Sequence, residues 1–239
     1  MGADQSTFRI VPELSVASLP RAIATLAPFG FRLLDGQGTR LRQGDQEIQL
    51  VEAGHQPPVL HGVIDHLALK ALDTDAAARA VQGLGALVDT GVTPDGPLEI
   101  AEFWGTGVRY QFFQGPGGAR LELCARRGGQ ALAGAALAAL IPGHDHIGIS
   151  CRDIAASVGF YRGLGLQLVH SVDLDRPDGR TEVRFLQLGS QTVELYSLPA
   201  RRSGLVTLPG QGFWLGLRFE GAGLQGRLTG PDGERVTLS

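Results

Sequence analysis

The sequence has few cysteines and almost no lysine or methionine. Its 239 residues include two cysteines, one methionine and one lysine, which is Lys70. Cys124 and Cys151 are too few for a disulfide framework, and their spacing does not form a CxxC site. Because cysteines ordinarily stay reduced in the cytosol, this usage predicts a cytoplasmic protein.

Two further absences narrow the classes of partner. The chain carries 21 basic and 24 acidic residues, which gives a formal net charge of −3. Binding to nucleic acid through its phosphates requires a basic surface, so we expect no nucleic-acid partner. No apolar run reaches the roughly 18 residues that span a bilayer, so we expect no membrane partner. The expected partner is a small-molecule substrate, bound by a monomer or a homodimer.

The sequence is rich in residues that build a core and join short strands. Hydrophobic residues make up 43% of the chain, and 35 residues are glycine. Glycine permits the tight turns between neighbouring strands, so this composition indicates a folded protein with many strands. A length of 239 residues is greater than that of a common single domain but less than that of two such domains. A chain built from smaller repeated units would explain this intermediate length.

The central part of the chain contains one order of predicted elements twice. Residues 144–196 read as a strand, a helix that begins after the N-cap candidate Asp153, and three further strands. Residues 63–125 repeat that order, and fainter copies occupy both ends of the chain. The last copy lacks most of its helix. The sequence therefore predicts an α+β fold of four βαβββ-type modules, of which the outer two are degenerate.

Stretches rich in glycine, alanine and proline separate these modules. The predicted boundaries are a degenerate N-terminal module at 1–56, a second module at 59–127, a linker at 128–143, a third module at 144–200 and a truncated C-terminal module at 205–239. The Ala-rich linker is either a short helix or a solvated or half-buried spacer, and we favour the spacer.

The two central modules share a histidine and a glutamate that the outer modules lack. His66 and His146 occupy the same position of the opening strand, and Glu122 and Glu194 occupy the same position of the closing strand. The aligned positions of the outer modules carry Val11, Gln49, Trp214 and Thr237. A lone histidine in a strand is usually a core residue and a lone glutamate is usually solvated, but the matched pair in two copies favours a shared function.

This set of side chains has the chemistry of a metal site. Imidazole nitrogen and carboxylate oxygen together suit one divalent ion such as Zn, Ni, Co, Mn or Fe. Alternate residues of a strand point to one face, so two facing modules could bring all four side chains to one ion. Two coordination positions would remain for water or substrate oxygens, and the ion would act there as a Lewis acid.

Three motifs of the third module resemble the vicinal oxygen chelate superfamily, which includes glyoxalase I, methylmalonyl-CoA epimerase, extradiol dioxygenases and bleomycin-binding proteins. They are the Asp-His-apolar-Gly-apolar opening at 145–149, the helix with Asp-Ile and Phe-Tyr at 153–161, and the Val-Glu-Leu ending at 193–195. The resemblance covers nearly the whole chain and is weak at both ends. It implies paired modules that form cupped mixed β-sheets around a divalent metal, as in the glyoxalase-like fold.

By this resemblance, the metal ligands are His66, Glu122, His146 and Glu194. Their order along the chain is similar to the glyoxalase and epimerase arrangement. It implies lyase or isomerase chemistry on a small molecule with adjacent oxygens, in which Glu194 or Glu122 leaves the metal and acts as the base. Because the ligands lie in the central modules, we expect the outer modules to pair with each other.

Two alternatives remain open at this stage. The first is an extradiol ring-cleaving dioxygenase with Fe(II). These members of the superfamily use two His and one Glu as ligands, which would leave Glu122 without a role. A non-catalytic binding or resistance protein would hold a drug or metabolite in the cup without a metal. In each case, loops at 92–104 and 173–180 would shape the pocket.

Weaker predictions concern side chains near the four candidates. Tyr196 shares the strand parity of Glu194 and is either a substrate-binding residue or part of the core. Arg184 lies on a long strand and either binds an anionic substrate or is an exposed solubilising residue. Asp65 and Asp145 each precede a candidate histidine, and we expect both to point the opposite way and bond backbone.

Overall fold

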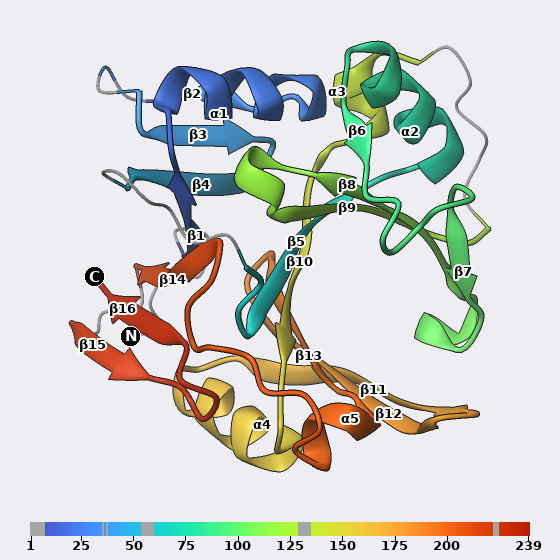
Figure 1. Cartoon of the computed structure of the whole chain (residues 1–239), viewed down its shortest axis with the longest axis vertical. Helices are drawn as coiled ribbons and strands as arrows, with labels where there is room; N and C mark the ends of the chain where they lie inside the picture. The colour runs from blue at the N-terminus through green and yellow to red at the C-terminus, as the bar shows by residue number, and fades with distance from the viewer. Residues whose placement is uncertain (1–7, 35, 37, 54–59, 129–134, 222–224) are drawn as a thin grey trace.

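Two mixed β-sheets pack side by side, and helices cover the convex face of the larger one (Figure 1). The computed structural model describes residues 8–34, 36, 38–53, 60–128, 135–221 and 225–239. The α+β class with cupped mixed sheets that the sequence predicts is confirmed. The predicted module boundaries at 56 and 59, and residues 129–134 of the predicted linker, lie outside the described residues.

The smaller sheet is built from the two ends of the chain. Its seven strands follow the order β15-β16-β14-β1-β4-β3-β2. They are β1 (Arg9–Val16), β2 (Arg32–Leu33), β3 (Arg40–Gln43), β4 (Gln46–Glu52), β14 (Trp214–Glu220), β15 (Gly226–Thr229) and β16 (Arg235–Leu238). At its centre, β1 runs antiparallel to β14 and parallel to β4. The two ends of the chain therefore pair with each other in one sheet.

The larger sheet is built from the middle of the chain. Eight of its nine strands follow the order β11-β12-β13-β10-β5-β9-β8-β6, and β7 pairs with β8. They are β5 (Ile64–Lys70), β6 (Leu87–Val88), β7 (Leu98–Ile100), β8 (Val108–Gln114), β9 (Arg120–Arg126), β10 (Gly143–Ser150), β11 (Gln167–Arg176), β12 (Gly179–Leu188) and β13 (Gln191–Ser197). The sheet curves strongly, with the antiparallel pair β5–β10 in the middle of the curve (Figure 1).

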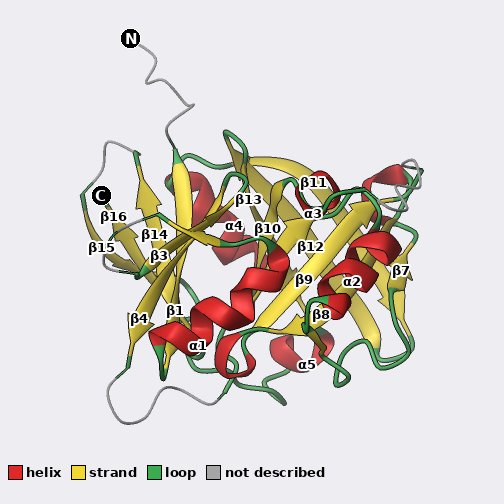
Figure 2. Cartoon of the chain, turned by 90° about the horizontal axis from the view of Figure 1, so that it is seen from above, coloured by secondary structure: helices red, strands yellow, loops and turns green. Residues whose placement is uncertain are grey.

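Helices cover the convex side of each half of this sheet (Figure 2). The helices are α1 (Leu19–Leu26), α2 (Thr74–Gly83), α3 (Leu137–Leu140), α4 (Ile154–Gly163) and α5 (Pro199–Arg202), and the 3₁₀ turns are η2 (Ala27–Phe29), η3 (Phe103–Gly105) and η4 (Pro116–Gly118). α4 packs against β11, β12 and β13, and α2 packs against β8 and β9. Asp153 caps α4 by accepting hydrogen bonds from the amides of Ala155 and Ala156, as the sequence predicts. Among the described residues, no helix is long and apolar enough to cross a membrane.

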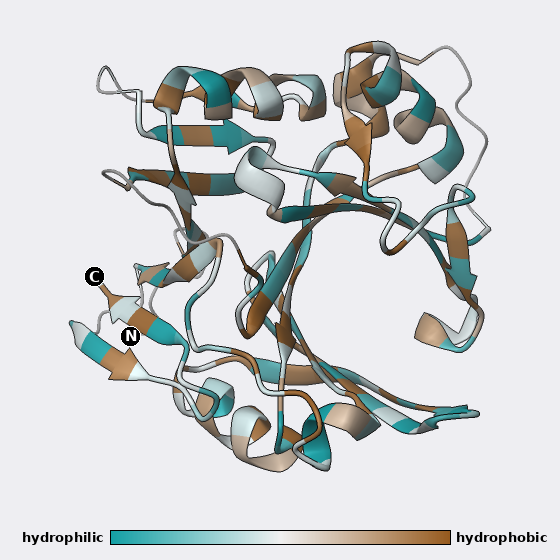
Figure 3. Ribbon diagram, viewed as in Figure 1, coloured by the Kyte–Doolittle hydropathy of each residue, from teal (hydrophilic) through white to brown (hydrophobic). Residues whose placement is uncertain are grey.

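The main hydrophobic core joins the two sheets. It includes Phe29 and Phe113, whose rings meet edge to face with centroids 5.5 Å apart, and Trp214 of the smaller sheet. The expected spacer at 128–143 contributes to it, because α3 forms one helical turn there and places Leu140 in the core. Strands of the larger sheet alternate hydrophobic and hydrophilic residues along their length, and the tip of the β11–β12 hairpin is hydrophilic (Figure 3). The core supports the larger sheet from behind and leaves its concave face for a site.

Candidate metal centre

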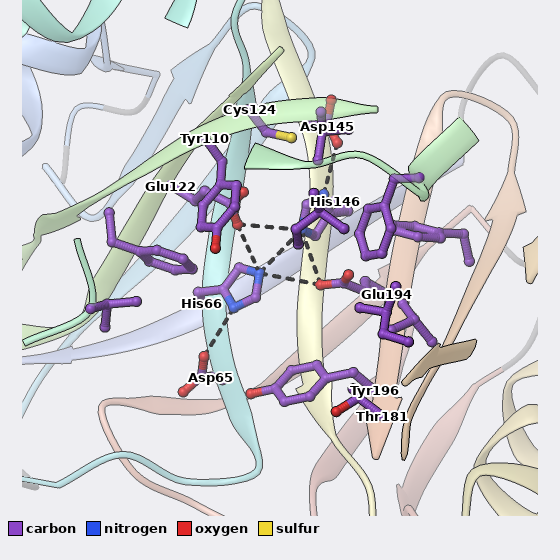
Figure 4. Close-up of a pocket in the computed structure, with 18 of the residues that line it drawn as sticks. Asp65, His66, Tyr110, Glu122, Cys124, Asp145, His146, Thr181, Glu194 and Tyr196 are labelled. Carbon is purple, nitrogen blue, oxygen red and sulfur yellow. Dashed lines mark hydrogen bonds and ion pairs between the residues drawn. The ribbon is translucent and has the colours of Figure 1, made fainter. Parts of the chain in front are cut away.

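The four candidate ligands come from four adjacent strands in the middle of the curved sheet. β9 carries Glu122, β5 carries His66, β10 carries His146 and β13 carries Glu194 (Figure 4). All four are buried, with between 4% and 7% of their surface exposed. Since alternate residues of each strand face the concave side, the sheet brings the four side chains to one place.

Small residues opposite the two imidazoles give them room to lie across the sheet. In the antiparallel β5–β10 pair, Gly148 lies opposite His66 and Ala68 lies opposite His146. A Cβ atom at Gly148 would lie only 2.1 Å from Cε1 of His66, so this strand position requires glycine. Glu194 is the neighbour of Gly148 on the next strand, which brings its carboxylate close to the His66 ring.

The donor atoms of these side chains converge on one point (Figure 4). His66 Nε2 lies 3.1 Å from His146 Nε2, 3.2 Å from Glu122 Oε2 and 3.5 Å from Glu194 Oε2. His146 Nε2 lies 3.5 Å from Glu122 Oε2 and 3.3 Å from Glu194 Oε2. Neighbouring donors around a divalent ion lie about 3.0 to 3.4 Å apart, since each bond is about 2.1 Å long. The spacing and the chemistry of these donors therefore fit a divalent ion.

The prediction that Asp65 and Asp145 point away from the histidines is wrong. Asp65 Oδ2 lies 3.0 Å from Nδ1 of His66, and Asp145 Oδ1 lies 2.7 Å from Nδ1 of His146. Each carboxylate can accept a hydrogen bond from the Nδ1–H group, which turns Nε2 toward the other donors. Asp65 also forms an ion pair with Arg120 at 2.7 Å. These two carboxylates fix the orientation that metal binding requires.

The electrostatics of the cluster keep its carboxylates ionised. Burial by itself raises the pKa of Glu122 and Glu194, but hydrogen bonds and charge from the two histidines outweigh it and lower both pKa values to about 2. Burial opposes protonation of His66 and His146, but the surrounding carboxylates raise the pKa of both well above the usual value. Four acidic groups around two imidazoles therefore form a site that attracts a cation.

The candidate ligands line a cavity of about 320 Å³ in the concave face. The rest of its lining is mainly aromatic and aliphatic, and includes Ile100, Phe103, Trp104, Phe112, Leu174 and Phe185. Among the described residues, no lysine or arginine lines this cavity. A volume of this size suits a small organic molecule, and the lining favours one whose body is apolar.

The structure separates the two predicted substrate-binding residues. Tyr196 lines the cavity, and its ring lies nearly parallel to that of His66 with centroids 6.3 Å apart. Arg184 instead donates a hydrogen bond of 2.7 Å to Asp173, and the next residue, Phe185, is the one that lines the cavity. Strand alternation therefore places Arg184 on the opposite face, and its predicted role in direct substrate contact is corrected.

Sequence patterns did not indicate Tyr110, which also lines the cavity (Figure 4). In the β8–β9 hairpin, Phe112 pairs with Glu122 and Tyr110 pairs with Cys124. Burial, reinforced by the negative charge of Glu122, raises the pKa of Tyr110, so its hydroxyl stays protonated at neutral pH. The register of this hairpin was the signal that could have placed Tyr110 beside the candidate ligand.

The comparisons with known proteins agree with this geometry. Residues 143–235 match the family model "Glyoxalase/Bleomycin resistance protein/Dioxygenase superfamily". The matched segment covers less than half of the chain. It contains His146 and Glu194, whereas His66 and Glu122 lie before it. No curated protein matches the sequence.

Similarity to solved structures extends over almost the whole chain. Glyoxalase I from Zea mays superposes with a TM-score of 0.69 and 16% sequence identity, over 98% of this chain and 93% of that one. A putative dioxygenase from Bacillus subtilis subsp. subtilis str. 168 superposes with a TM-score of 0.51 and 13% identity, over 88% of this chain and 68% of that one. At these identities the likeness establishes a shared glyoxalase-like fold.

Proposed function

We propose that this protein is a divalent-metal-dependent enzyme that binds a small molecule through two adjacent oxygens and moves a proton next to them. This is lyase or isomerase chemistry of the glyoxalase and epimerase kind. The observation that supports it best is the convergence of two imidazole nitrogens and two carboxylate oxygens, with imidazole–carboxylate distances of 3.2 to 3.5 Å, in an apolar cavity. Both carboxylates can bind the metal, and one of them can leave it and act as the base.

The metal ligands in this proposal are His66, Glu122, His146 and Glu194. A bound divalent cation would supply Lewis acidity, which makes a C–H bond beside a chelated carbonyl easier to deprotonate. The chain's own residues hold the substrate oxygens at one side of the cavity and exclude water with an apolar wall. Tyr196 is positioned in this proposal to contact the substrate beside His66.

The two glutamates lie at similar distances from the imidazoles, because Oε2 of Glu122 is 3.2 and 3.5 Å, and Oε2 of Glu194 is 3.5 and 3.3 Å, from the Nε2 atoms of His66 and His146. His66, Glu122 and His146 form a group in which each offers an atom within 4.8 Å of the others. We assign Glu122 to this fixed group and Glu194 to the role of base. Charge and hydrogen bonds from the two histidines lower the pKa of Glu194 and keep it ionised, which is the form that a proton acceptor requires. The return of that proton to another carbon or to the same carbon would decide between isomerisation and epimerisation.

Hydrogen–deuterium exchange on a series of α-hydroxyketones tests this proposal for the substrate class as a whole. Protein loaded with Zn²⁺, Ni²⁺ or Co²⁺ is incubated in D₂O with each compound, and NMR follows the loss of the C–H signal next to the carbonyl. We expect metal-dependent exchange that disappears in Glu194→Gln while the metal is retained. Glu220→Gln is a matched control, because Glu220 pairs with Arg40 in the other sheet.

Two results would contradict the proposal. Oxygen uptake with catechols by the Fe(II)-loaded protein, without any exchange, would assign it to the dioxygenases. Ligand affinity that survives the double change His66→Ala plus His146→Ala in a metal-free protein would assign it to the binding proteins. Glu122→Gln adds a further distinction, because a dioxygenase site of two His and one Glu would keep its metal after this change.

A further inference from the structure

Trp104 has a backbone conformation that is unusual for a large side chain. Its φ of 56° and ψ of 17° lie in the left-handed region, and it is the only non-glycine residue with positive φ in the described part of the chain. This conformation costs on the order of 1 to 3 kcal/mol for such a residue, so surrounding contacts must hold it. η3, which contains Trp104, lies on the open side of the curved sheet between β7 and β8 (Figure 1).

Three side chains from three different strands hold the indole ring. The His170 ring stacks on it with centroids 4.3 Å apart, and the guanidinium carbon of Arg126 lies 3.7 Å from its centroid. The Phe185 ring packs against the indole with centroids 4.9 Å apart. The Trp104 backbone N–H donates a hydrogen bond of 3.1 Å to Nε2 of His170. These contacts fix the indole ring against β9, β11 and β12.

The indole ring separates two hollows on the concave side. Trp104, Phe185 and Asp145 line both the 320 Å³ cavity of the candidate metal centre and a second hollow of about 210 Å³. Phe185 and Asp145 belong to strands of the sheet. Trp104 is therefore the shared lining residue that comes from outside the strands, in the 3₁₀ turn η3. The second hollow is more polar, and its lining includes Lys70, Arg126, Gln187 and Ser190. Removal of the indole would join an apolar chamber to a polar, cationic one.

We propose that Trp104 is a specificity-determining residue, whose indole closes one side of the cavity and limits it to compact ligands. Ligands that extend from the metal site toward Lys70 and Arg126 are excluded while the indole is in place. The assignment of a substrate preference to Trp104 rests on the proposed function, but the partition between the two hollows does not. The strained backbone of Trp104 agrees with this role, because strained residues cluster at ligand-binding sites and persist only where surrounding contacts hold them.

Two variants test the role of the ring. Trp104→Asn removes the ring and keeps a residue that tolerates the left-handed conformation. Trp104→Phe keeps an aromatic wall and serves as the matched control. Because the Trp104 side chain is only partly buried, we expect both variants to fold. A cooperative thermal unfolding transition like that of the wild type shows that the core has not loosened.

The partition is tested first in metal-free protein with 1-anilinonaphthalene-8-sulfonate, whose rings match the apolar cavity and whose sulfonate matches the cations of the second hollow. We expect Trp104→Asn to bind this dye about tenfold more tightly than the wild type, and Trp104→Phe to stay within about threefold. Fluorescence titration gives the affinities. An affinity of Trp104→Asn within about twofold of the wild type would overturn the partition.

The substrate preference is tested in Co²⁺-loaded protein with two chelators that present adjacent oxygens, compact maltol and extended 3-hydroxyflavone. We expect Trp104→Asn to improve binding of 3-hydroxyflavone about tenfold and to leave maltol within about threefold, as measured by the Co²⁺ absorption spectrum. An unchanged ratio of the two affinities would overturn the role in specificity. If the wild type takes up no Co²⁺, the proposed function fails, whereas the dye titration still decides whether Trp104 separates the hollows.

Discussion

At the scale of single residues, each candidate metal-binding imidazole is oriented by the carboxylate that precedes it in the sequence. Asp65 bonds Nδ1 of His66, and Asp145 bonds Nδ1 of His146. Both Nε2 atoms therefore face the cavity before a ligand arrives. A ring that is already oriented loses less conformational freedom when it binds, so these carboxylates favour tight binding of a metal.

Asp145→Asn tests this orientation. The amide oxygen can still accept a hydrogen bond from the Nδ1–H group, but it no longer supplies the negative charge that strengthens His146 as a ligand. We expect metal affinity to fall about tenfold to a hundredfold, measured by competition with a chromophoric chelator. Asp153→Asn is the matched control, because Asn also caps helices well and Asp153 caps α4. Equal affinities of Asp145→Asn and the wild type would contradict this role.

The sequence could indicate His66, Glu122, His146 and Glu194, because their repeated positions on strands of fixed parity are visible in one chain. It could not indicate the role of the two aspartates. The alternation rule describes the direction of each Cα–Cβ bond, and a carboxylate can still reach back to the imidazole of the next residue. The strand β10 is also irregular here, since its register with β5 shifts between His144 and His146.

At the scale of secondary-structure elements, the site depends on the central β5–β10 pair. This antiparallel pair places His66 opposite Gly148 and His146 opposite Ala68. Each imidazole lies over a small residue of the facing strand and reaches toward the far strand, where a glutamate is located. The same arrangement occurs in both halves of the sheet, which explains how two repeated modules form one centre.

Gly148→Ala tests this packing. A methyl group there would meet His66 Cε1 at 2.1 Å, so the imidazole must move away from the other donors. We expect metal affinity to fall at least about tenfold while the protein remains folded, measured by chelator competition and circular dichroism. Gly159→Ala is the control, because nothing lies within 4 Å of a Cβ at that position in α4, and alanine favours helix. Unchanged affinity in Gly148→Ala would rule out this account of the packing.

Regular elements were predictable to different degrees. The strands and helix of the third module carry clear alternation and an N-cap residue, and the structure has β10, α4, β11, β12 and β13 in that order. The segment between β6 and β8 has no such pattern, because its course is set by turns at several glycines with positive φ, such as Gly96 and Gly105. That segment contains β7 and Trp104, so the wall of the cavity could not be derived from sequence periodicity.

At the scale of the whole molecule, the two sheets carry different chemistry. The larger sheet holds the candidate metal centre, whereas ion pairs between arginine and glutamate occupy the smaller one. Glu47 pairs with Arg40 at 2.6 Å and with Arg9 at 3.3 Å, and also pairs with Arg42. The repeated modules have thus diverged, and we infer a single metal centre in the described part of the chain.

The ion pairs of Glu47 predict a pH dependence of stability. Burial raises the pKa of Glu47, but hydrogen bonds from Arg42 and Arg40 lower it more, so its net pKa lies below the usual 4.5. A depressed pKa stabilises the fold above pH 4.5, and this contribution is lost as the pH falls through the folded-state pKa. We expect Glu47→Gln to lower the free energy of unfolding by about 1 to 2 kcal/mol at neutral pH. Urea unfolding measures this difference.

The difference between Glu47→Gln and the wild type should shrink as the pH is lowered below 4.5, because Glu47 itself becomes protonated there. Glu182→Gln is a suitable control, since Glu182 is more exposed and its pairs with Arg184 and Arg202 are longer, at 3.7 Å and 3.5 Å. A constant difference across the acidic range would contradict the assignment of this pH dependence to Glu47.

We propose that the chain binds one divalent ion through His66, Glu122, His146 and Glu194, and the function proposed for the cavity depends on this ion. Elemental analysis of protein purified without added metal, followed by titration of the stripped protein with Co²⁺, tests it most directly. We expect one ion per chain in the wild type, and a loss of that ion in the His66→Ala plus His146→Ala variant, which should still fold. A wild type that binds no divalent ion, or a variant that binds it as tightly as the wild type, would rule out this metal centre.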